Sequence, residues 1–522
     1  MSFAYFLSFG RFSMNRRQFL AAAGGTAAAL CFGKQAAGAA GPVRPHIIYV
    51  LADDMGYGNI SCLNPDSMIQ TPNADGLAAR GVVFTDAHSG CSVCTPTRYG
   101  ILTGRYYWRN EIESSGRGNA PALIPPERLT VAALLKENGY RTVGIGKWHL
   151  GLNLVNREGK IAGIEDVDYE APIKGGPVDL GFDYYFGIPA SLDMSPYFYF
   201  ENDRIVQAAT ERTSGDHGRN LRRAGPIAPD FKFEEVLPTC GRKAVECIDN
   251  HAGGKPLFMY LALTAPHTPV VPSAEFAGKS PLGAYGDFCV QVDAVLGDVV
   301  RALERNGMLE DTLLIFTSDN GIAPAVDPEE FKQMGHSGSY IYRGMKTDIF
   351  DGGHRIPFIA AWPGKIKAGT VCGKTVCLSD LMATAADICG DTLPPDAGED
   401  SVSMLPALLG EDGPERPAVV HESANGSLAI REGKWKLLFC PGSGGKSHPT
   451  LKEAKAQGLP KAQLYDMEKD PGETENVQAE HPELVARLTK VVQTFIDNGR
   501  STPGPKQEVR GRVKPWRTEY GQ

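Results

Sequence analysis

The chain has 522 residues, of which 42% are hydrophobic and 22% are charged. This composition is typical of a globular protein with a large core and two domains. The net charge of −8 argues against a nucleic-acid-binding protein, so an anionic substrate would need a local cationic pocket.

The N-terminal stretch has the pattern of an export signal. Arg16 and Arg17 precede the small, apolar run AAAGGTAAALCFG, and AAGAAG then offers small residues for cleavage. Paired arginines before such a run resemble a twin-arginine signal. We therefore expect residues 1–40 to be a signal peptide, with Met14 as the more typical start. A membrane anchor is the alternative, but the run is shorter than the roughly 20 residues of a span. The expected location is periplasmic or secreted, reached through the twin-arginine export machinery, with no stable membrane span.

Short apolar runs alternate with helical patterns along most of the chain. This alternation predicts an α/β layered domain with a large, mostly parallel, buried sheet over residues 43–405. The predicted strands are 46–51, 141–145, 257–262, 312–317 and 356–362, and the predicted helices include 130–138 and 288–306.

The pattern changes near residue 405. A β-like segment at 427–439, the acidic stretch LYDMEKDPGETEN and an amphipathic helix at Pro482–Asn498 predict a smaller α+β domain over 406–522. Its last residues are rich in Pro, Gly and charge, which favours a loose tail. Ten cysteines follow the expected signal. Disulfides are compatible with export, but one sequence does not give their connectivity.

Polar side chains follow four of the predicted strands. In an open α/β sheet the carboxyl ends of the strands meet at one crevice, so these groups should converge. An Asp-Asp or Asp-Asn pair alone is more often a solvated strand-end turn than a metal site. Together the oxygen donors suit calcium or magnesium better than zinc. The residues are Asp53, Asp54, Lys147, His149, His267, Asp319 and Asn320.

Residues 91–106, CSVCTPTRYGILTGRY, carry the remaining candidate chemistry. Pro96 suits the first turn of a helix, which would place Cys94 at a helix N-terminus where backbone N–H groups favour anions. Arg98 lies one turn further along. A redox or metal-binding CxxC is the ordinary reading of Cys91 and Cys94, but no second pair accompanies it.

These residues resemble the sulfatase signature, in which the cysteine before x-Pro-x-Arg is oxidised to formylglycine. The resemblance, to the arylsulfatase-A-like and N-acetylgalactosamine-6-sulfatase-like members, covers roughly residues 45–498. It implies an alkaline-phosphatase-like α/β/α sandwich with a small C-terminal antiparallel sheet. The other matching motifs are LADDMGYGN, GKWHLG, GIPASLD, APHTP, TSDNG, RGMKTDIFDGGHRIPFIAAWPG and LYDMEKDPGETEN.

Carried over position by position, the resemblance implies a complete active site. Ca²⁺, or less typically Mg²⁺, would be held by Asp53, Asp54, Asp319, Asn320 and Cys94 modified to formylglycine by a maturation enzyme. Two departures are Thr97, where Ser is commoner, and Phe350-Asp351, where Trp-Glu is usual. The catalytic and sulfate-binding positions would be Arg98, Lys147, His149, His267 and Lys346, with Ser191 and Asp193 at the pocket edge.

The expected reaction is hydrolysis of a sulfate monoester. Hydrated formylglycine would attack sulfur with help from Asp319, His267 would protonate the leaving alkoxide, and His149 would let the sulfated diol collapse. The expected substrate is a sulfated sugar at a chain end, from which the enzyme removes the sulfate. The preferred candidates are 6-O-sulfated galactose and N-acetylgalactosamine. The alternatives are a phosphate or phosphonate monoester hydrolase of the same superfamily and a catalytically dead carbohydrate-binding relative.

Overall fold

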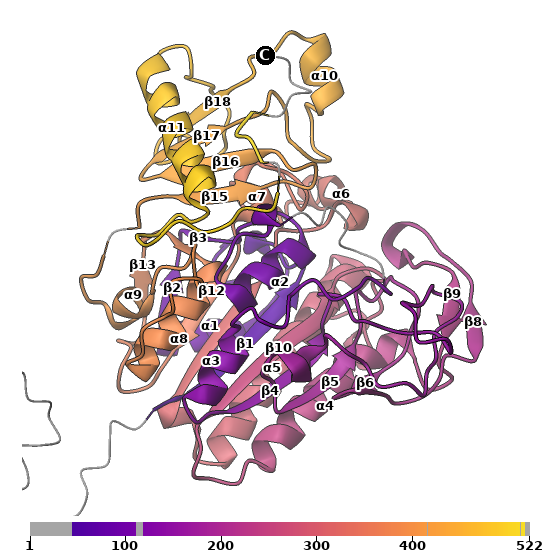
Figure 1. The fold of residues 1–522 in the computed structure, drawn as a ribbon. Helices are drawn as coiled ribbons and strands as arrows, with labels where there is room; N and C mark the ends of the chain where they lie inside the picture. The colour runs from indigo at the N-terminus through magenta and orange to yellow at the C-terminus, as the bar shows by residue number, and fades with distance from the viewer. Residues whose placement is uncertain (1–43, 111–117, 415, 512, 517–522) are drawn as a thin grey trace, which may run out of the picture. The chain divides into compact units, whose positions relative to one another are not determined.

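Ten strands form one mixed sheet at the centre of the molecule (Figure 1). The structure is a computed structural model that describes residues 44–110, 118–414, 416–511 and 513–516. The predicted signal peptide, residues 1–40, lies outside these described residues. In sheet order the strands are β13 (Thr370–Cys372), β2 (Val82–Phe84), β12 (Phe358–Ala361), β11 (Thr312–Ser318), β1 (His46–Asp53), β10 (Leu257–Pro266), β4 (Arg141–Lys147), β5 (Tyr184–Ile188), β6 (Phe200–Glu201) and β7 (Arg204–Ile205).

The middle of this sheet is parallel and buried, as the apolar runs predict. β11, β1, β10, β4 and β5 pair in parallel, and every residue of β10 is buried. β12 pairs antiparallel with β11, so the run at 356–362 forms a strand of opposite direction. The predicted fold class, a largely parallel mixed sheet of the alkaline-phosphatase type, is confirmed.

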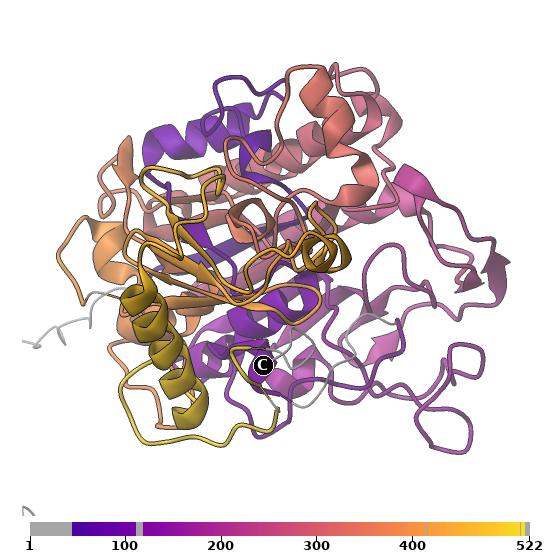
Figure 2. The same cartoon turned by 90° about the horizontal axis from the view of Figure 1, so that it is seen from above.

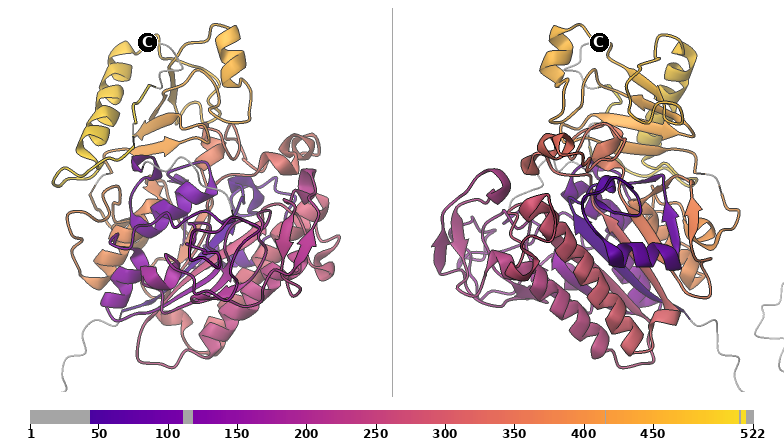
Figure 3. Two further views of the ribbon diagram at one scale, coloured as in Figure 1. Left: turned by 45° about the vertical axis from the view of Figure 1, so that its right-hand side comes forward. Right: turned by 180° about the vertical axis from the view of Figure 1, so that it is seen from behind.

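Helices cover both faces of the sheet and complete a three-layer sandwich. α5 (Gly283–Arg305) packs beside α4 (Val236–Asp249) and α1 (Pro72–Arg80) on one face, seen from behind in Figure 3. α2 (Cys94–Thr103), α3 (Val131–Glu137) and α8 (Leu381–Cys389) pack together on the other. The shorter helices are α6 (Pro328–Gln333), α7 (Asp351–His354), α9 (Leu405–Leu409) and α10 (Leu451–Ala456).

The C-terminal residues form a separate four-stranded antiparallel sheet. Its strands are β15 (Val419–Glu422), β16 (Leu428–Glu432), β17 (Trp435–Leu438) and β18 (Gln463–Asp466). The segment expected at 427–439 as one β-like element is therefore a hairpin, turning at Gly433 with φ of 54°. α11 (Pro482–Asn498) packs its apolar side against this sheet, as the view from above shows (Figure 2). Two small ribbons, β3 (Ala87–His88) with β14 (Val376–Cys377) and β8 (Glu211–Thr213) with β9 (Gly225–Ile227), complete the strands.

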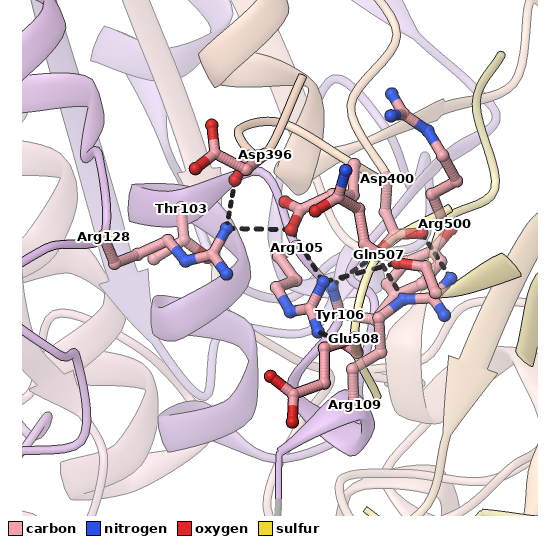
Figure 4. A network of polar contacts seen from close by, with 12 residues as sticks. Thr103, Arg105, Tyr106, Arg109, Arg128, Asp396, Asp400, Arg500, Gln507 and Glu508 are labelled. Carbon is pink, nitrogen blue, oxygen red and sulfur yellow. Dashed lines mark hydrogen bonds and ion pairs between the residues drawn. The ribbon is translucent and has the colours of Figure 1, made fainter. Parts of the chain in front are cut away.

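The stretch after α11, for which the sequence predicts a loose tail, returns to the larger sheet's side of the molecule. The Arg105 guanidinium donates to the carbonyl of Glu508 at 2.8 Å (Figure 4). Arg510 N donates to the carbonyl of Arg109 at 3.2 Å. Arg500 reaches the carbonyl of Pro395 at 3.0 Å. Residues 499–511 are therefore anchored to the segments around Arg105 and Pro395.

All ten described cysteines are free thiols. In the part of the chain that the structure describes, no helix combines the length and apolarity needed to cross a membrane.

Three buried histidines lie where the C-terminal sheet meets the larger part. His88 is on β3, His354 ends α7 and His421 is on β15. The rings of His354 and His421 stack with centroids 3.7 Å apart and planes 10° apart. Each ring offers a nitrogen within 4.8 Å of the others. The His88 nitrogens, however, already lie 3.1 Å from His354 Nδ1 and 3.0 Å from Asp86 Oδ1, so we assign no metal to this cluster.

The His421 ring makes stability depend on pH. Its Nδ1 lies 3.0 Å from the carbonyl oxygen of Ser89, and Nε2 has no hydrogen-bond partner among the described residues. Burial, together with the neighbouring His88 and Lys436, holds the pKa of His421 well below its ordinary value of 6.5. The unfolded chain therefore binds more protons than the folded chain below pH 6.5, and stability falls as pH falls.

We expect His421→Phe to flatten this pH dependence. Removing one such group should reduce the slope of the unfolding free energy by about 1.4 kcal/mol per pH unit between about pH 5 and 6. Urea unfolding across that range measures the slope, and the exposed ring of His217 provides a control through His217→Phe. Equal slopes for His421→Phe and the unsubstituted chain would contradict the explanation.

Candidate functional site

The carboxyl ends of four parallel strands bring the predicted polar residues together. β1, β10, β4 and β11 are neighbours, and Asp53 pairs in register with Pro266 while Ala52 pairs with Ser318. Asp53 ends β1 and Lys147 ends β4, so both side chains reach the same edge. His267 and Asp319 directly follow β10 and β11. The sheet topology thus produces the convergence that the sequence predicts.

Cys94 is the first residue of α2, as the position of Pro96 predicts. Val93 before it is extended, and every residue of α2 is buried. The Sγ of Cys94 lies 3.4 Å from Nδ1 of His149. Burial raises the pKa of the Cys94 thiol, although Lys147 and Lys346 act against it. A thiol in this environment is a weak nucleophile unless it is chemically modified.

Two cations pair with the acids on one side of the site. The Arg98 guanidinium lies 2.8 Å from Asp319 Oδ2 and 3.6 Å from Asp53 Oδ1, and Lys147 Nζ lies 2.7 Å from Asp53 Oδ2. All four side chains are fully buried. Burial alone would raise the pKa of Asp53, but Lys147, His267 and Arg98 hold it well below its usual range. Burial and the charge of Asp53 raise the pKa of Asp319 to about 6.

Lys346 and Asn320 surround Asp54 on the other side. Lys346 Nζ lies 2.6 Å from Asp54 Oδ1, and the side-chain amide of Asn320 donates to the same oxygen at 2.7 Å. His267 Nε2 is 3.6 Å from Asp54 Oδ2. Burial lowers the pKa of Lys346, but Asp54 and Cys94 outweigh it and raise the pKa above its ordinary value. Lys346 is therefore a permanent cation in the pocket.

The donor set fits a hard divalent cation. Asp53, Cys94 and Asp319 each offer a ligand atom within 4.8 Å of the others, and so do Asp53, Asp54 and His267. Asp53 Oδ1 and Asn320 Oδ1 are buried and accept no hydrogen bond from any described residue. Buried oxygens without a donor are costly, and a cation would satisfy them.

Two site residues adopt backbone conformations that are unfavourable for residues with a Cβ. Asp54 has φ of 68° and His149 has φ of 55°. Such strain persists where the surrounding structure enforces it and is concentrated at functional sites. Burial, with the charges of Lys147 and Arg98, holds the pKa of His149 well below its ordinary value. The ring is therefore neutral and able to accept a proton beside residue 94.

Ser191 and Asp193 follow β5, and Ser191 contacts two residues of the site. Ser191 Oγ lies 3.2 Å from Lys147 Nζ and 3.2 Å from Nε2 of His267, so it bridges the two groups. Asp193 forms an ion pair with Arg223, whose backbone N–H also donates to the carbonyl of Asp193 at 2.9 Å. Arg223 is not among the residues predicted for the site. Its signal was the basic run DHGRNLRR before β9.

The aromatic residues after Asp193 belong to the core. Phe198 and Phe200 are fully buried, and Tyr197 and Tyr199 are 2% and 6% exposed. Their rings stack on neighbours such as Tyr185 and Phe186. They therefore do not offer faces on which a sugar could stack.

The unusual Phe350-Asp351 pair is structural. Asp351 is fully buried and accepts from Lys436 Nζ at 2.9 Å and from the Arg355 guanidinium at 2.6 Å. The guanidinium of Arg343 lies over the Phe350 ring, with its central carbon Cζ 3.9 Å from the ring centroid. Both residues join the loop carrying Lys346 to the C-terminal sheet.

A three-layer sandwich with acidic and cationic groups at the carboxyl edge of its sheet defines a hydrolase site for an anionic ester. The Sulfatase family model matches residues 45–390. The chain belongs to the sulfatase family, whose members are sulfuric ester hydrolases.

Relatives of known activity match nearly the whole chain. An N-acetylgalactosamine-6-O-sulfatase of Bacteroides thetaiotaomicron is 34% identical over 86% of this chain and 93% of its own length. Human arylsulfatase A is 32% identical over 91% of this chain and 92% of its own length. A solved structure from work on the metabolism of multiple glycosaminoglycans by Bacteroides thetaiotaomicron superposes with a TM-score of 0.76. It is 33% identical and covers 87% of this chain and 99% of that one.

Proposed function

We propose that the chain hydrolyses a sulfate monoester of a carbohydrate, using formylglycine at position 94 and a calcium ion. The observation that carries the proposal is the charge balance of the pocket. Asp53, Asp54 and Asp319 are matched by Arg98, Lys147 and Lys346. A divalent cation in this neutral arrangement would leave it net positive, which suits an anionic ester.

Asp53, Asp54, Asp319 and Asn320, with the modified residue 94, would hold the metal. Their all-oxygen side chains favour calcium, with magnesium as the alternative. When bound, the ion supplies positive charge that stabilises the transition state.

Residue 94 would supply the nucleophile. Formylglycine hydrates to a geminal diol, and Asp319 would take the proton of one hydroxyl as its oxygen forms a bond to sulfur. The ester S–O bond breaks, and His267 gives its proton to the leaving sugar oxygen. His149, 3.4 Å from the Sγ of Cys94, would then take the proton of the second hydroxyl. The C–O bond to the sulfate breaks, sulfate leaves, and the aldehyde is restored.

The cations would divide into two roles. Arg98 directs Nε and Nη2 to Asp319 at 3.0 and 2.8 Å and Nη1 to the carbonyl of Lys147 at 3.2 Å, so it orients Asp319. Lys147 ends β4 and donates to Asp53, whereas Lys346 lies in the loop before α7 and donates to Asp54. We assign the direct contacts with sulfate oxygens to these two ammonium groups.

The substrate proposal rests on similarity and export. The N-acetylgalactosamine-6-O-sulfatase of Bacteroides thetaiotaomicron supports a 6-O-sulfated galactose or N-acetylgalactosamine at a chain end. The expected twin-arginine signal would direct the enzyme out of the cytoplasm, which is compatible with an extracellular glycan as substrate. Because Cys94 is 4% exposed in the folded chain, the formylglycine-generating enzyme would act before folding and therefore before export of folded protein.

Mass spectrometry and a substrate panel test the proposal. The tryptic peptide 81–98 from active protein should carry an aldehyde in place of the Cys94 thiol. The purified protein should cleave a 6-O-sulfated N-acetylgalactosamine oligosaccharide faster than its 4-O-sulfated isomer, and an aryl sulfate faster than aryl phosphate or phosphonate monoesters. An intact thiol in active protein would refute the nucleophile. Faster phosphonate or phosphate hydrolysis would favour the superfamily alternative, and glycan binding without turnover would indicate a catalytically dead relative.

A further inference from the structure

The loop that carries Lys346 contains a strained residue that the proposed chemistry does not explain. Thr347 has φ of 85°, a conformation that a β-branched residue rarely adopts. On one side of it, Lys346 Nζ contacts both carboxylate oxygens of Asp54 at 2.6 and 2.8 Å. Strain of this kind is kept only where surrounding contacts enforce it.

The peptide groups of Thr347 connect the nucleophile's loop with the C-terminal sheet. Thr347 N donates to the carbonyl of Ser92, two residues before Cys94, at 2.9 Å. Ala424 N, just after β15, donates to the carbonyl of Thr347 at 3.0 Å. Ser92 N itself donates to the carbonyl of Glu422 at 2.9 Å. The C-terminal sheet thus contacts the backbone of both the Cys94 loop and the Lys346 loop.

On the other side of Thr347, a buried carboxylate is held by the loop Ser443–Ser447, which we call the 443–447 loop. Asp348 Oδ1 accepts from Lys446 N at 2.8 Å and from Ser447 N at 3.0 Å. Asp348 Oδ2 accepts from Met345 N at 2.9 Å and from the Ser447 hydroxyl. Ile349 N donates to the carbonyl of Ser443 at 2.7 Å. Asp348 is fully buried, so these donors fix its position.

We propose that the 443–447 loop is a positioning element of the active site. It fixes the Asp348 carboxylate, and its Lys446 N–H also donates to the Thr347 hydroxyl at 3.1 Å. These contacts hold Thr347 at positive φ and keep the Lys346 ammonium at Asp54. The sheet domain that follows residue 405 therefore contributes to sulfate binding without touching the substrate. This inference rests on the proposed function, because it takes Lys346 as a sulfate-binding group.

Gly445 allows a direct test of the contact. An added Cβ there would lie 2.4 Å from the carbonyl oxygen of Thr347 and 2.5 Å from Asp348 Oδ1. Gly445→Ala should therefore displace the loop that carries Lys346. We expect kcat/KM for an aryl sulfate to fall about 10²-fold, because a displacement near 1 Å at a catalytic group has this effect. Affinity for inorganic sulfate, measured by calorimetry, should weaken in parallel.

A double-mutant cycle separates positioning from general structural damage. In a Lys346→Ala background, Gly445→Ala should cause little further loss of kcat/KM or of sulfate affinity, because the group it positions is already missing. An equal loss in both backgrounds would overturn the inference, as would no loss in the unsubstituted background. Sulfate affinity keeps the two hypotheses apart. If the unsubstituted chain binds sulfate but hydrolyses no sulfate ester, the proposed function fails while the cycle still tests the 443–447 loop.

Two further variants guard against misfolding. Gly253→Ala adds a Cβ that meets no described atom within 4 Å, so it should leave both activity and sulfate affinity unchanged. Ser447→Ala removes one donor to Asp348 without adding bulk, and should give a smaller loss that also disappears in the Lys346→Ala background. If Gly445→Ala does not fold, Ser447→Ala with and without Lys346→Ala decides the question. A loss of kcat/KM from Ser447→Ala that is equally large in the Lys346→Ala background would contradict the proposal.

Discussion

Replacement of Cys94 by alanine is expected to lower kcat for sulfate ester hydrolysis by at least about 10³-fold, because it removes the proposed nucleophile. The fold should survive. The Arg98–Asp319 and Lys147–Asp53 ion pairs, at 2.8 and 2.7 Å, do not involve the sulfur. The measurement is the steady-state rate on an aryl sulfate at saturating substrate, with circular dichroism to confirm folding.

Cys91→Ala is the matched control, because Cys91 is 3% exposed and only three residues away. Thr97 Oγ1 donates to its backbone carbonyl at 2.8 Å, a contact that the substitution keeps. This variant should retain the unsubstituted rate within a few-fold. Cys94→Ser should behave differently from both, since a sulfated serine has no second hydroxyl and stalls after about one turnover. Full turnover by Cys94→Ala would remove the basis of the mechanism.

The large sheet and the contents of its carboxyl edge could be predicted from the sequence because both follow from local patterns. Apolar runs of strand length indicate buried strands, and parallel strands necessarily bring Asp53, Lys147, His267 and Asp319 to one edge. The position of Cys94 at the start of α2 followed from Pro96. These inferences required no knowledge of distant contacts.

The contacts that position these groups could not be predicted in the same way. The pairing of Asp193 with Arg223 and of Asp348 with Lys446 and Ser447 joins loops far apart in the chain. No periodicity specifies which loops meet, because loop conformation depends on tertiary packing. The hairpin at 427–439 was missed for a local reason. Its only turn signal is Gly433 within EGK, where a longer strand fits the pattern equally well.

Arg109→Met should destabilise the protein by about 3–5 kcal/mol, because it leaves the buried carboxylate of Asp400 without its counter-charge. The fully buried Arg109 guanidinium donates to Asp400 at 2.8 and 2.7 Å (Figure 4). It also donates to the carbonyl of Phe495 in α11 at 2.8 Å and stacks on Trp108. Asp400 would keep hydrogen bonds from Tyr106 N and Ser501 N but no positive charge from Arg109. Urea unfolding measures the loss.

A matched surface pair distinguishes burial from hydrogen-bond geometry. Arg305 also donates to one carboxylate through two nitrogens, to Asp249 at 2.9 and 2.5 Å, but its side chain is 46% exposed. Arg305→Met should cost far less, since water replaces the lost partner. Substituting both members of the buried pair, Arg109→Met with Asp400→Leu, should recover much of the stability, because the penalty comes from the orphaned charge. Equal losses for Arg109→Met and Arg305→Met would show that burial does not set the cost of losing the ion pair.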